Sequence, residues 1–294
     1  MTDGRPDGRT EGQAVGDTES TRPPVRLSAR PAYRPPLLKE QPVGDPAVPR
    51  LELREWAERY GVVAGITGRG QSGFGDGRAG GFSLGLWSEE NVGQVMTRWR
   101  AFLAAFRPAF GAVILSHQVH GSAVRWHRQA DDGWLLLDGV DGHATGSRGV
   151  LLAITVADCI PVYLVVPEKG VVALLHAGWR GTAGAILERG VELLEEEACA
   201  TASDIVMHCG VGICGECYEV GSEVLAQLGA HLPPEAASGH VDLRDLLARQ
   251  AQRLGLTEVT CSPWCSAHDR AQFFSHRASG GRDGRMVAYL GMPA

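Results

Sequence analysis

The sequence lacks several features that would assign it to a membrane-bound or disulfide-stabilised class. No stretch approaches the roughly 18 consecutive apolar residues of a transmembrane helix, and the N-terminal segment has no apolar core of a signal peptide. Its seven cysteines are too few for a disulfide scaffold in 294 residues, and their number is odd. We therefore expect a cytoplasmic protein, without a membrane partner, whose thiols are reduced and available for metal binding or catalysis.

Positive charge is also scarce. The formal net charge of -6 at pH 7 gives no support for nucleic-acid binding, so we expect no nucleic acid among the partners. Hydrophobic residues make up 44% of the chain and charged residues 21%, which is ordinary for a globular protein. A chain of 294 residues can bury a substantial core, as one large domain or two small ones. These properties fit an enzyme.

Residues 1–49 differ in composition from the rest of the chain. They contain nine of the sixteen prolines and no Trp or Phe, so they bury too little apolar surface to offset the entropy lost on ordering. We predict a disordered Pro/Arg/Gly-rich tail over 1–49 and one folded domain over 50–294. The glycine-rich stretch 65–85 then places Arg69 and Arg78 among backbone N–H groups that can cradle an anion, although a surface loop has the same composition.

Apolar periodicity predicts a mixture of helices and strands without regular β-α-β alternation. The fold class that we expect is α/β (mixed α+β), a single domain with a central mixed β-sheet flanked by helices. Helices are predicted at 90–106, at 182–199 with Thr182 as N-cap, and after Asp242. Strands are predicted at 112–119, at 151–158 paired with 162–167 across Pro161, at 171–177, at 204–213, and as one or two short strands near the C-terminus.

Three of the predicted strands end in a side chain that can bind a metal. His120 follows one apolar run, Cys159 a second, and His176 a third. Strands of one sheet can bring their ends together, so these side chains can converge although 39 and 17 positions separate them. Two imidazoles and a thiolate form a three-ligand zinc set with an open fourth position, which is typical of a catalytic site. Each residue alone has a simpler interpretation as a buried histidine or a small apolar cysteine.

Polar neighbours extend this predicted site. Arg180 follows His176 at a sharp strand-to-helix turn and can hold an anion such as phosphate. Asp158 precedes Cys159 and can orient a ligand or take a proton. His117 and His120 lie three apart, so in an extended strand only one of them would face the pocket, with Gln118 on the His120 side.

The remaining thiols allow a second metal site. Cys214-x2-Cys217 and Cys261-x3-Cys265 could form a four-thiolate structural zinc site, although 43 residues separate the pairs and the second spacing is unusual. His268 and His276 are further histidines without an assigned partner. His276 and the adjacent Arg277 could line the pocket or lie on the surface.

An ordered set of motifs resembles one known family. The motifs are HQVHG at 117–121, a turn at Asp141, TVADCIPV at 155–162, LLHAGWRG at 174–181, CYEVG at 217–221 and FFSHR at 273–277. Together they are similar to the laccase-domain, or polyphenol-oxidase-like, family over roughly residues 60–292. Its members are described as purine nucleoside phosphorylases with additional adenosine deaminase and methylthioadenosine phosphorylase activity. The resemblance implies a single α/β domain and zinc ligands at His120, Cys159 and His176.

The function implied by this resemblance is a zinc-dependent purine nucleoside phosphorylase with adenosine deaminase activity. The partners would be phosphate and the nucleosides adenosine, inosine, guanosine and methylthioadenosine. The residues assigned to the site are Asp158, Arg180 and Glu219 for catalysis, and Arg69, Gln118, Asp141 and Arg277 for substrate binding.

Two alternatives remain open at this point. One is a copper-dependent polyphenol oxidase, because Cu²⁺ outcompetes Zn²⁺ for such ligands. The other is a non-catalytic nucleotide-binding protein. Multicopper chemistry is disfavoured because the chain has ten histidines and no His-x-His pair. The sequence leaves open whether the protein is a monomer or a homodimer.

Overall fold

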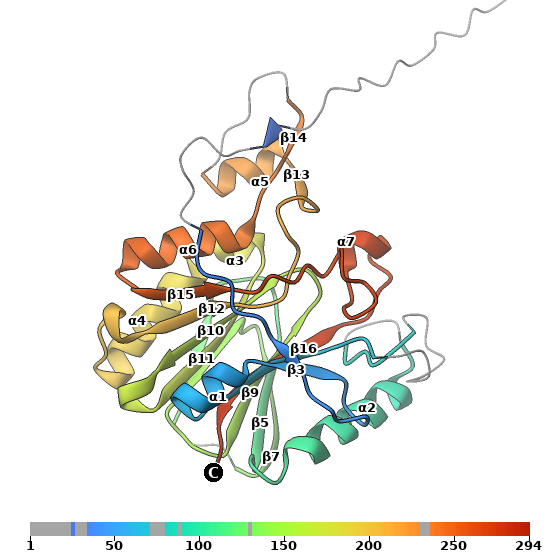
Figure 1. Ribbon diagram of the computed structural model, residues 1–294, viewed down its shortest axis with the longest axis vertical. Coiled ribbons are helices and arrows are strands. Elements are labelled where there is room, and N and C mark those ends of the chain that lie inside the picture. Colours follow the sequence, from blue (N-terminus) through green and yellow to red (C-terminus); the bar gives the residue numbers. More distant parts are fainter. Residues whose placement is uncertain (1–24, 27–33, 71–79, 87–89, 129–130, 230–235) are drawn as a thin grey trace, which may run out of the picture.

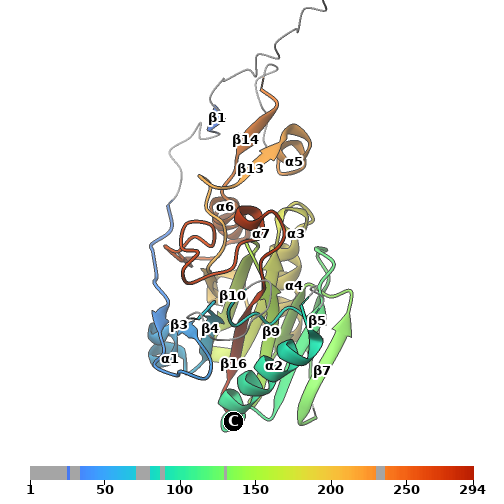
Figure 2. The same ribbon diagram turned by 90° about the vertical axis from the view of Figure 1, so that its right-hand side faces the viewer.

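Two large mixed β-sheets lie face to face between two layers of helices (Figures 1 and 2). The computed structural model describes residues 25–26, 34–70, 80–86, 90–128, 131–229 and 236–294. The expected mixed α+β class is confirmed, and the core is built around two large sheets instead of one. Arg78 lies outside the described residues.

The first sheet has seven described strands in the order β2-β3-β4-β16-β9-β5-β7. Strand β5 runs parallel to both β9 and β7, and the other neighbours are antiparallel. The strands are β2 (Gln41–Pro42), β3 (Arg50–Glu52), β4 (Val63–Thr67), β5 (Ala112–His117), β7 (Gly133–Asp138), β9 (Val150–Val156) and β16 (Met286–Met292).

The second sheet has six described strands in the order β15-β12-β10-β11-β8-β6, and a small third sheet has the order β1-β14-β13. The strands of the second sheet are β6 (Val124–His127), β8 (Gly142–Thr145), β10 (Ile160–Val166), β11 (Val171–Ala177), β12 (Val206–Cys209) and β15 (Glu258–Cys261). Those of the third are β1 (Val25–Arg26), β13 (Glu219–Gly221) and β14 (Ser238–His240).

The helices α2, α4 and α6 cover the outer faces of the two large sheets. In Figure 1, α4 and α6 lie on the left and α2 at the lower right, with the strands between them. The α-helices are α1 (Arg54–Tyr60), α2 (Val92–Phe106), α3 (Trp179–Ala183), α4 (Ile186–Ala198), α5 (Ser222–Gln227), α6 (Leu243–Leu254) and α7 (His276–Ser279). Short 3-10 turns occupy Pro167–Lys169 and Ala202–Asp204.

Alternation along the central strands explains this layering. Successive side chains of a strand point to opposite faces, so a strand that is apolar throughout needs a partner on each side. In β9, Leu152 and Ile154 join the core between the sheets, whereas Leu151 and Ala153 face α2. Strands β10 and β11 divide their side chains in the same way between the inter-sheet core and the layer of α4 and α6. The continuous apolar runs in the sequence are therefore the signature of strands buried on both faces.

Helix and strand boundaries differ from the sequence expectations at three places. The start of α6 agrees with the expectation, because its N-cap is Asp242. Helix α2 begins after an N-cap at Asn91. The helix predicted to begin at Thr182 is instead divided into α3 and α4, because Ala185 has a left-handed backbone conformation, and the Thr182 side chain does not cap it.

The second and third differences concern β9 and β10, which were expected to pair with each other. They belong to different sheets, so the chain crosses from one sheet to the other between them. Pro161 is not a break but the second residue of β10, opposite His176 in the register. Near the end of a strand, a proline removes few of the hydrogen bonds between neighbouring strands. The C-terminal region forms one long strand, β16, preceded by the short helix α7.

The first described part of the chain is packed on the domain. Composition placed residues 34–49 in a disordered tail, yet Glu40 and Val48 are 0% exposed. Glu40 accepts hydrogen bonds from Ser262 and faces His208 at 3.2 Å. This segment of low apolar content is held by buried polar contacts and a short strand, β2, instead of by hydrophobic burial alone. Residues 1–24 and 27–33 of the predicted tail lie outside the described residues.

Among the helices of the described residues, none has the length and apolar character required to cross a membrane.

Candidate metal centre

The three predicted metal ligands converge at the junction of the two large sheets. His120 lies in the loop after β5, Cys159 in the turn from β9 to β10, and His176 near the end of β11. Their ligand atoms all lie within 4.8 Å of one another, and the His120 and His176 rings meet edge to face at 4.8 Å. Strands β5 and β9 belong to the seven-stranded sheet and β11 to the six-stranded one, so the ligands come from two sheets and not from one.

Unusual backbone conformations aim these side chains at one point. His120 and Asp158 both have positive φ angles, 61° and 85°, which non-glycine residues seldom adopt. Gly178 lies against the cluster, where an added Cβ would stand 2.9 Å from Cys159 Sγ and 3.3 Å from His120 Cδ2. The glycine after His176–Ala177 is therefore required by the close approach of the ligands.

Asp141 lies directly behind two of the ligands. Its carboxylate accepts hydrogen bonds from the backbone N–H groups of Val119, His120 and Gly121 at 2.8–3.1 Å. It also bonds His176 Nδ1 at 2.9 Å. A carboxylate on one ring nitrogen fixes the tautomer and leaves the other nitrogen, Nε2, to face a metal. Asp141 is 0% exposed, so it positions ligands and does not line a cavity.

The electrostatics of the cluster favour the ligand form of the thiol. Burial raises the pKa of Cys159, but the charge of His176 and hydrogen bonds from His120 and His176 outweigh it and lower the pKa to about 6. Burial lowers the pKa of His176, and the charge of Cys159 with the Asp141 hydrogen bond raises it to about 9. The thiolate is the form of cysteine that binds metals, and it is populated here at neutral pH.

The donor set suits a transition metal. Two imidazole nitrogens and one thiolate sulfur are ligands for zinc or copper, whereas magnesium and calcium prefer oxygen. Within the described residues, one other group of His, Cys, Asp or Glu side chains is close enough to hold an ion, at Cys214, Cys217, Cys265 and His268. Both groups border a cavity, and the three-ligand group borders the one that Arg180, Arg277 and Arg285 line.

That cavity has a volume of about 470 Å³. It combines the three ligands with cationic, aromatic and polar side chains, and its lining residues are Gly85, His117, Gln118, His120, Thr155, Ala157, Asp158, Cys159, His176, Trp179, Arg180, Tyr218, His276, Arg277 and Arg285. A larger cavity of about 910 Å³ lies between α3, α5 and α6 and borders the other Cys/His group. In the smaller cavity, three potential metal ligands and three arginines meet.

Four of the residues predicted from sequence line this cavity beside the metal ligands. They are Gln118, Asp158, Arg180 and Arg277. The Gln118 amide is held by Thr155 through both backbone groups and the hydroxyl at 2.8–2.9 Å. Asp158 accepts hydrogen bonds from Ser266 Oγ and the Arg277 backbone N–H, both at 2.6 Å. Arg180 stacks on Trp179 with its guanidinium 4.4 Å from the ring centre.

Two other predicted residues lie outside the cavity lining. Arg69 forms an ion pair of 2.6 Å with Asp283 and stacks on Phe274, so its charge is already used in the structure. Glu219 is exposed, and its carboxylate accepts a hydrogen bond from Ser238. Its backbone carbonyl, not its carboxylate, reaches the wall of the cavity by accepting a hydrogen bond from Arg277.

Sequence reasoning also excluded or missed residues that the structure brings to the cavity. His117 lines it together with His120, because β5 ends at His117 and the alternation of a strand does not extend to His120. Tyr218, Trp179 and Arg285 line it too. Tyr218 and Trp179 stand inside the motifs 217–221 and 174–181, so their aromatic side chains next to ligand positions were a usable signal.

A family comparison covers most of the described domain. The family described as "Multi-copper polyphenol oxidoreductase laccase" matches residues 63–293. This range contains all three metal ligands and every residue of the cavity lining.

Individual relatives and one solved structure agree with this match. The chain is 34% identical to "Purine nucleoside phosphorylase YlmD" of Geobacillus stearothermophilus over 248 residues, which is 79% of this chain and 90% of the relative. It is 36% identical to "Adenosine deaminase RL5" from an unknown prokaryotic organism over 160 residues, 51% of this chain and 61% of the relative. The crystal structure of YlmD from G. stearothermophilus superposes with a TM-score of 0.78 at 29% identity, covering 88% of this chain and all of that one.

Proposed function

The chain belongs to the multi-copper polyphenol oxidoreductase laccase family, and from this membership we propose that it is a metal-dependent purine nucleoside phosphorylase with adenosine deaminase activity. Relatives that bear these two names support the two reactions. The observation that carries the proposal is the cavity itself, where a three-ligand metal set faces arginines and aromatic rings. The nucleoside substrates that we propose are adenosine, inosine, guanosine and methylthioadenosine, with phosphate as co-substrate.

Zinc is the ion that we propose for the His120, Cys159 and His176 set. Bound there with an open position, it would supply Lewis acidity and lower the pKa of a bound water towards 7. The chain supports this by holding Cys159 as a thiolate and the His176 ring in one orientation through Asp141.

We assign phosphate binding to the arginine side chains that line the cavity. Arg180 is the anion ligand that we propose, because it lines the cavity and its guanidinium stacks on Trp179 without a hydrogen bond or ion pair to any described residue. In phosphorolysis a phosphate oxygen forms the bond to C1′ of the ribose while the C1′–N9 bond breaks. The purine leaves with the electron pair of that bond and needs a proton. A planar guanidinium that is not engaged by a carboxylate is suited to orient the attacking phosphate.

Proton transfer is assigned to Asp158. Of the two proposed acid/base groups, only Asp158 lines the cavity, whereas the Glu219 carboxylate is outside it. Ser266 Oγ and the Arg277 backbone N–H hold the Asp158 carboxylate in place, so it is preorganised to move a proton at the purine ring. In deamination the same carboxylate would serve the amino group that leaves from C6. Tyr218 and Trp179 offer aromatic faces for the base.

A multicopper oxidase is the rival that the family description suggests. Its trinuclear copper centre needs His-x-His pairs, which this chain does not contain. In the described residues the two metal-capable groups contribute three histidines in total. This donor count favours single-ion chemistry over a multicopper centre.

Product analysis tests the proposed function. The full chain is incubated with adenosine, inosine or methylthioadenosine, with and without phosphate, and products are separated by chromatography. We expect free purine base only when phosphate is present, and inosine from adenosine without phosphate. His120→Ala should abolish both, whereas Cys199→Ser, at an exposed thiol outside the cavity, should change neither. Phosphorolysis that persists in His120→Ala would overturn the metal assignment, and oxidation of phenols without base release would favour the oxidase.

A further inference from the structure

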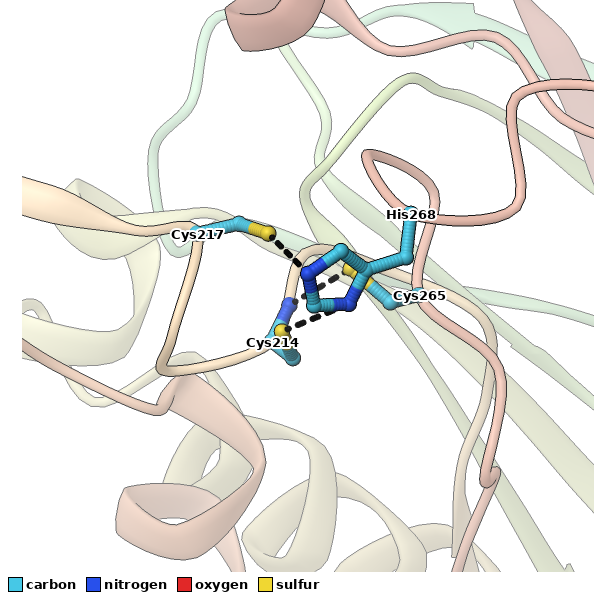
Figure 3. A group of neighbouring side chains, drawn as sticks. All are labelled: Cys214, Cys217, Cys265 and His268. Carbon is cyan, nitrogen blue, oxygen red and sulfur yellow. Dashed lines mark hydrogen bonds between the residues drawn. The ribbon is translucent and has the colours of Figure 1, made fainter.

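A second group of ligand atoms lies outside the cavity of the proposed reaction. Cys214, Cys217, Cys265 and His268 each direct one donor atom to a common region, and these atoms lie within 4.8 Å of one another (Figure 3). Two of the cysteines come from the loop between β12 and β13, and the other two ligands come from the loop after β15. Nothing in the proposed nucleoside chemistry uses this group.

Contacts within the group already join the two loops. Cys217 Sγ lies 3.1 Å from His268 Nε2, and Cys214 Sγ lies 3.7 Å from His268 Nδ1. The Cys214 backbone N–H donates to Cys265 Sγ at 3.3 Å. Figure 3 shows the imidazole of His268 between the sulfur atoms of Cys214 and Cys217. Cys265 is buried, Cys214 and Cys217 are half-buried, and His268 is exposed at the rim.

We propose that these four residues form a second metal site, a closed Cys3His zinc site that stabilises the fold. Four protein ligands leave no position for water or substrate, which distinguishes a structural zinc site from a catalytic one. Three thiolates with one imidazole select zinc over oxygen-preferring ions such as magnesium. The site is separate from His120, Cys159 and His176 and does not depend on the reaction at that centre.

The ligand set differs from the four-thiolate site that cysteine spacing suggested. Cys261 is a residue of β15 and stands opposite Cys209 of β12 in the parallel register, where it is buried. It cannot leave that position without breaking the strand pair. His268 takes the fourth place because the chain turns back after Cys265. The Cys265 backbone N–H donates to the Asp269 carboxylate, and the Asp269 N–H donates to the Cys265 carbonyl, which closes a tight turn.

The separations are compatible with zinc after a small adjustment. Zinc–sulfur bonds of about 2.3 Å in a tetrahedron place neighbouring ligands about 3.8 Å apart. The largest separation here is no more than 4.8 Å, so the group would contract by about 1 Å at most around an ion with such bonds. The exposed His268 ring is free of core packing and can turn one nitrogen to the common centre.

The position of the site explains what the ion would support. Ser266 lies between Cys265 and His268, and its hydroxyl donates to the Asp158 carboxylate at 2.6 Å. The Ser266 backbone N–H donates to Gly212, and Ile213 N–H donates to the Asp158 carbonyl. Cys217 is followed by Tyr218, which lines the cavity. An ion that ties the two loops together therefore holds the turn beside Cys159 and one wall of the cavity.

Zinc analysis of the full chain tests the second site independently of activity. Protein is purified in reducing buffer without chelator, and zinc per chain is measured for wild type, Cys159→Ala, Cys217→Ser and the control Cys199→Ser. We expect two zinc ions in wild type and in the control, and one in each of the other variants. Cys217→Ser should also lower Tm by at least about 5 °C, since structural zinc contributes directly to folding stability.

The outcomes separate the two sites. Cys217→Ser that retains as much zinc as Cys199→Ser would overturn the second site, even if the nucleoside chemistry is confirmed. Loss of one zinc in Cys217→Ser with no nucleoside turnover in any protein would support the second site and count against the proposed function alone.

A measurement on folded protein covers the case in which Cys217→Ser does not fold. X-ray absorption of the zinc in Cys159→Ala should show three sulfur ligands near 2.3 Å and one nitrogen near 2.0–2.1 Å. His268→Gln, at the exposed rim, should weaken zinc retention during dialysis against a chelator. Zinc with oxygen and nitrogen ligands only, or fewer than seven free thiols in unfolded wild type because two of the four residues form a disulfide, would refute the proposal.

Discussion

Two metal-capable groups lie among the described residues, and they use the same kinds of donor atom in different numbers. His120, Cys159 and His176 offer three ligands and open onto a cavity of about 470 Å³. Cys214, Cys217, Cys265 and His268 offer four, which is a full set of protein ligands for one ion, at the edge of the larger cavity. An open position is needed for chemistry, whereas a full ligand set serves stability. The number of donors that the fold brings together, more than their identity, separates the two roles.

Their supports differ as well. The three-ligand group lies where two sheets meet, and buried Asp141 orients it through a histidine ring nitrogen and three backbone N–H groups. In the four-residue group both nitrogens of His268 face sulfur atoms, and the ligands stand on loops. A site at the ends of strands, with a carboxylate behind it, is positioned before any ion binds. A site on loops gains much of its order from the ion.

The largest difference should appear when Cys159 is replaced by alanine. A bound metal contributes several kcal/mol of transition-state stabilisation, so we expect phosphorolysis and deamination to fall about a thousandfold. The secondary structure should stay intact, because Cys159 stands in a turn and not in a strand. Steady-state assays with circular dichroism measure the two effects. Full activity of Cys159→Ala would show that the three-ligand site is not the reactive one, and the comparison of an open reactive site with a closed structural site would then fail.

A smaller but more selective effect is expected from Asp141→Asn. The amide keeps the size of the side chain but loses the charge that holds His176, and such changes cost about 10–100-fold in metal affinity or activity. Competitive zinc titration should show this loss at the three-ligand site and none at Cys214, Cys217, Cys265 and His268. The matched control is Asp131→Asn at an exposed position. Equal weakening of both sites would mean that Asp141 acts through global stability.

The smallest effect tests the physical link between the two groups. Ser266→Ala removes the hydroxyl that holds Asp158, and the loss of one hydrogen bond to a charged group, about 1.5 kcal/mol, corresponds to about a tenfold drop in kcat. KM for the nucleoside and zinc content should stay unchanged, because Ser266 is neither a ligand nor a lining residue. Ser203→Ala, on the exposed surface, is the control. A fall in zinc content without a change in kcat would mean that Ser266 supports the four-residue metal site and not Asp158.

Much of the fold was predictable because burial on both faces leaves a plain signature. The apolar runs at β5, β9, β10 and β11 are continuous, and the helices α2 and α6 follow helical spacing. The assignment of these strands to two sheets was not predictable. Strands β9 and β10 are neighbours in sequence, yet the turn at Asp158 carries the chain from one sheet to the other. No local pattern distinguishes that crossing from a hairpin.

The sites divide in the same way. The sequence by itself determined which side chains have metal-binding chemistry, that strands end near His120, Cys159 and His176, and that a glycine, Gly178, follows His176 where the ligands approach closely. Only the tertiary structure decided which donors meet. It placed Arg69 in an ion pair with Asp283 and left Arg180 facing the cavity. It also put His268, instead of Cys261, beside Cys265, because the pairing of β12 with β15 holds Cys261 away. Donor identity is a property of each residue, whereas the distance between donors follows from strand register and sheet packing, which the spacing of residues along the chain does not encode.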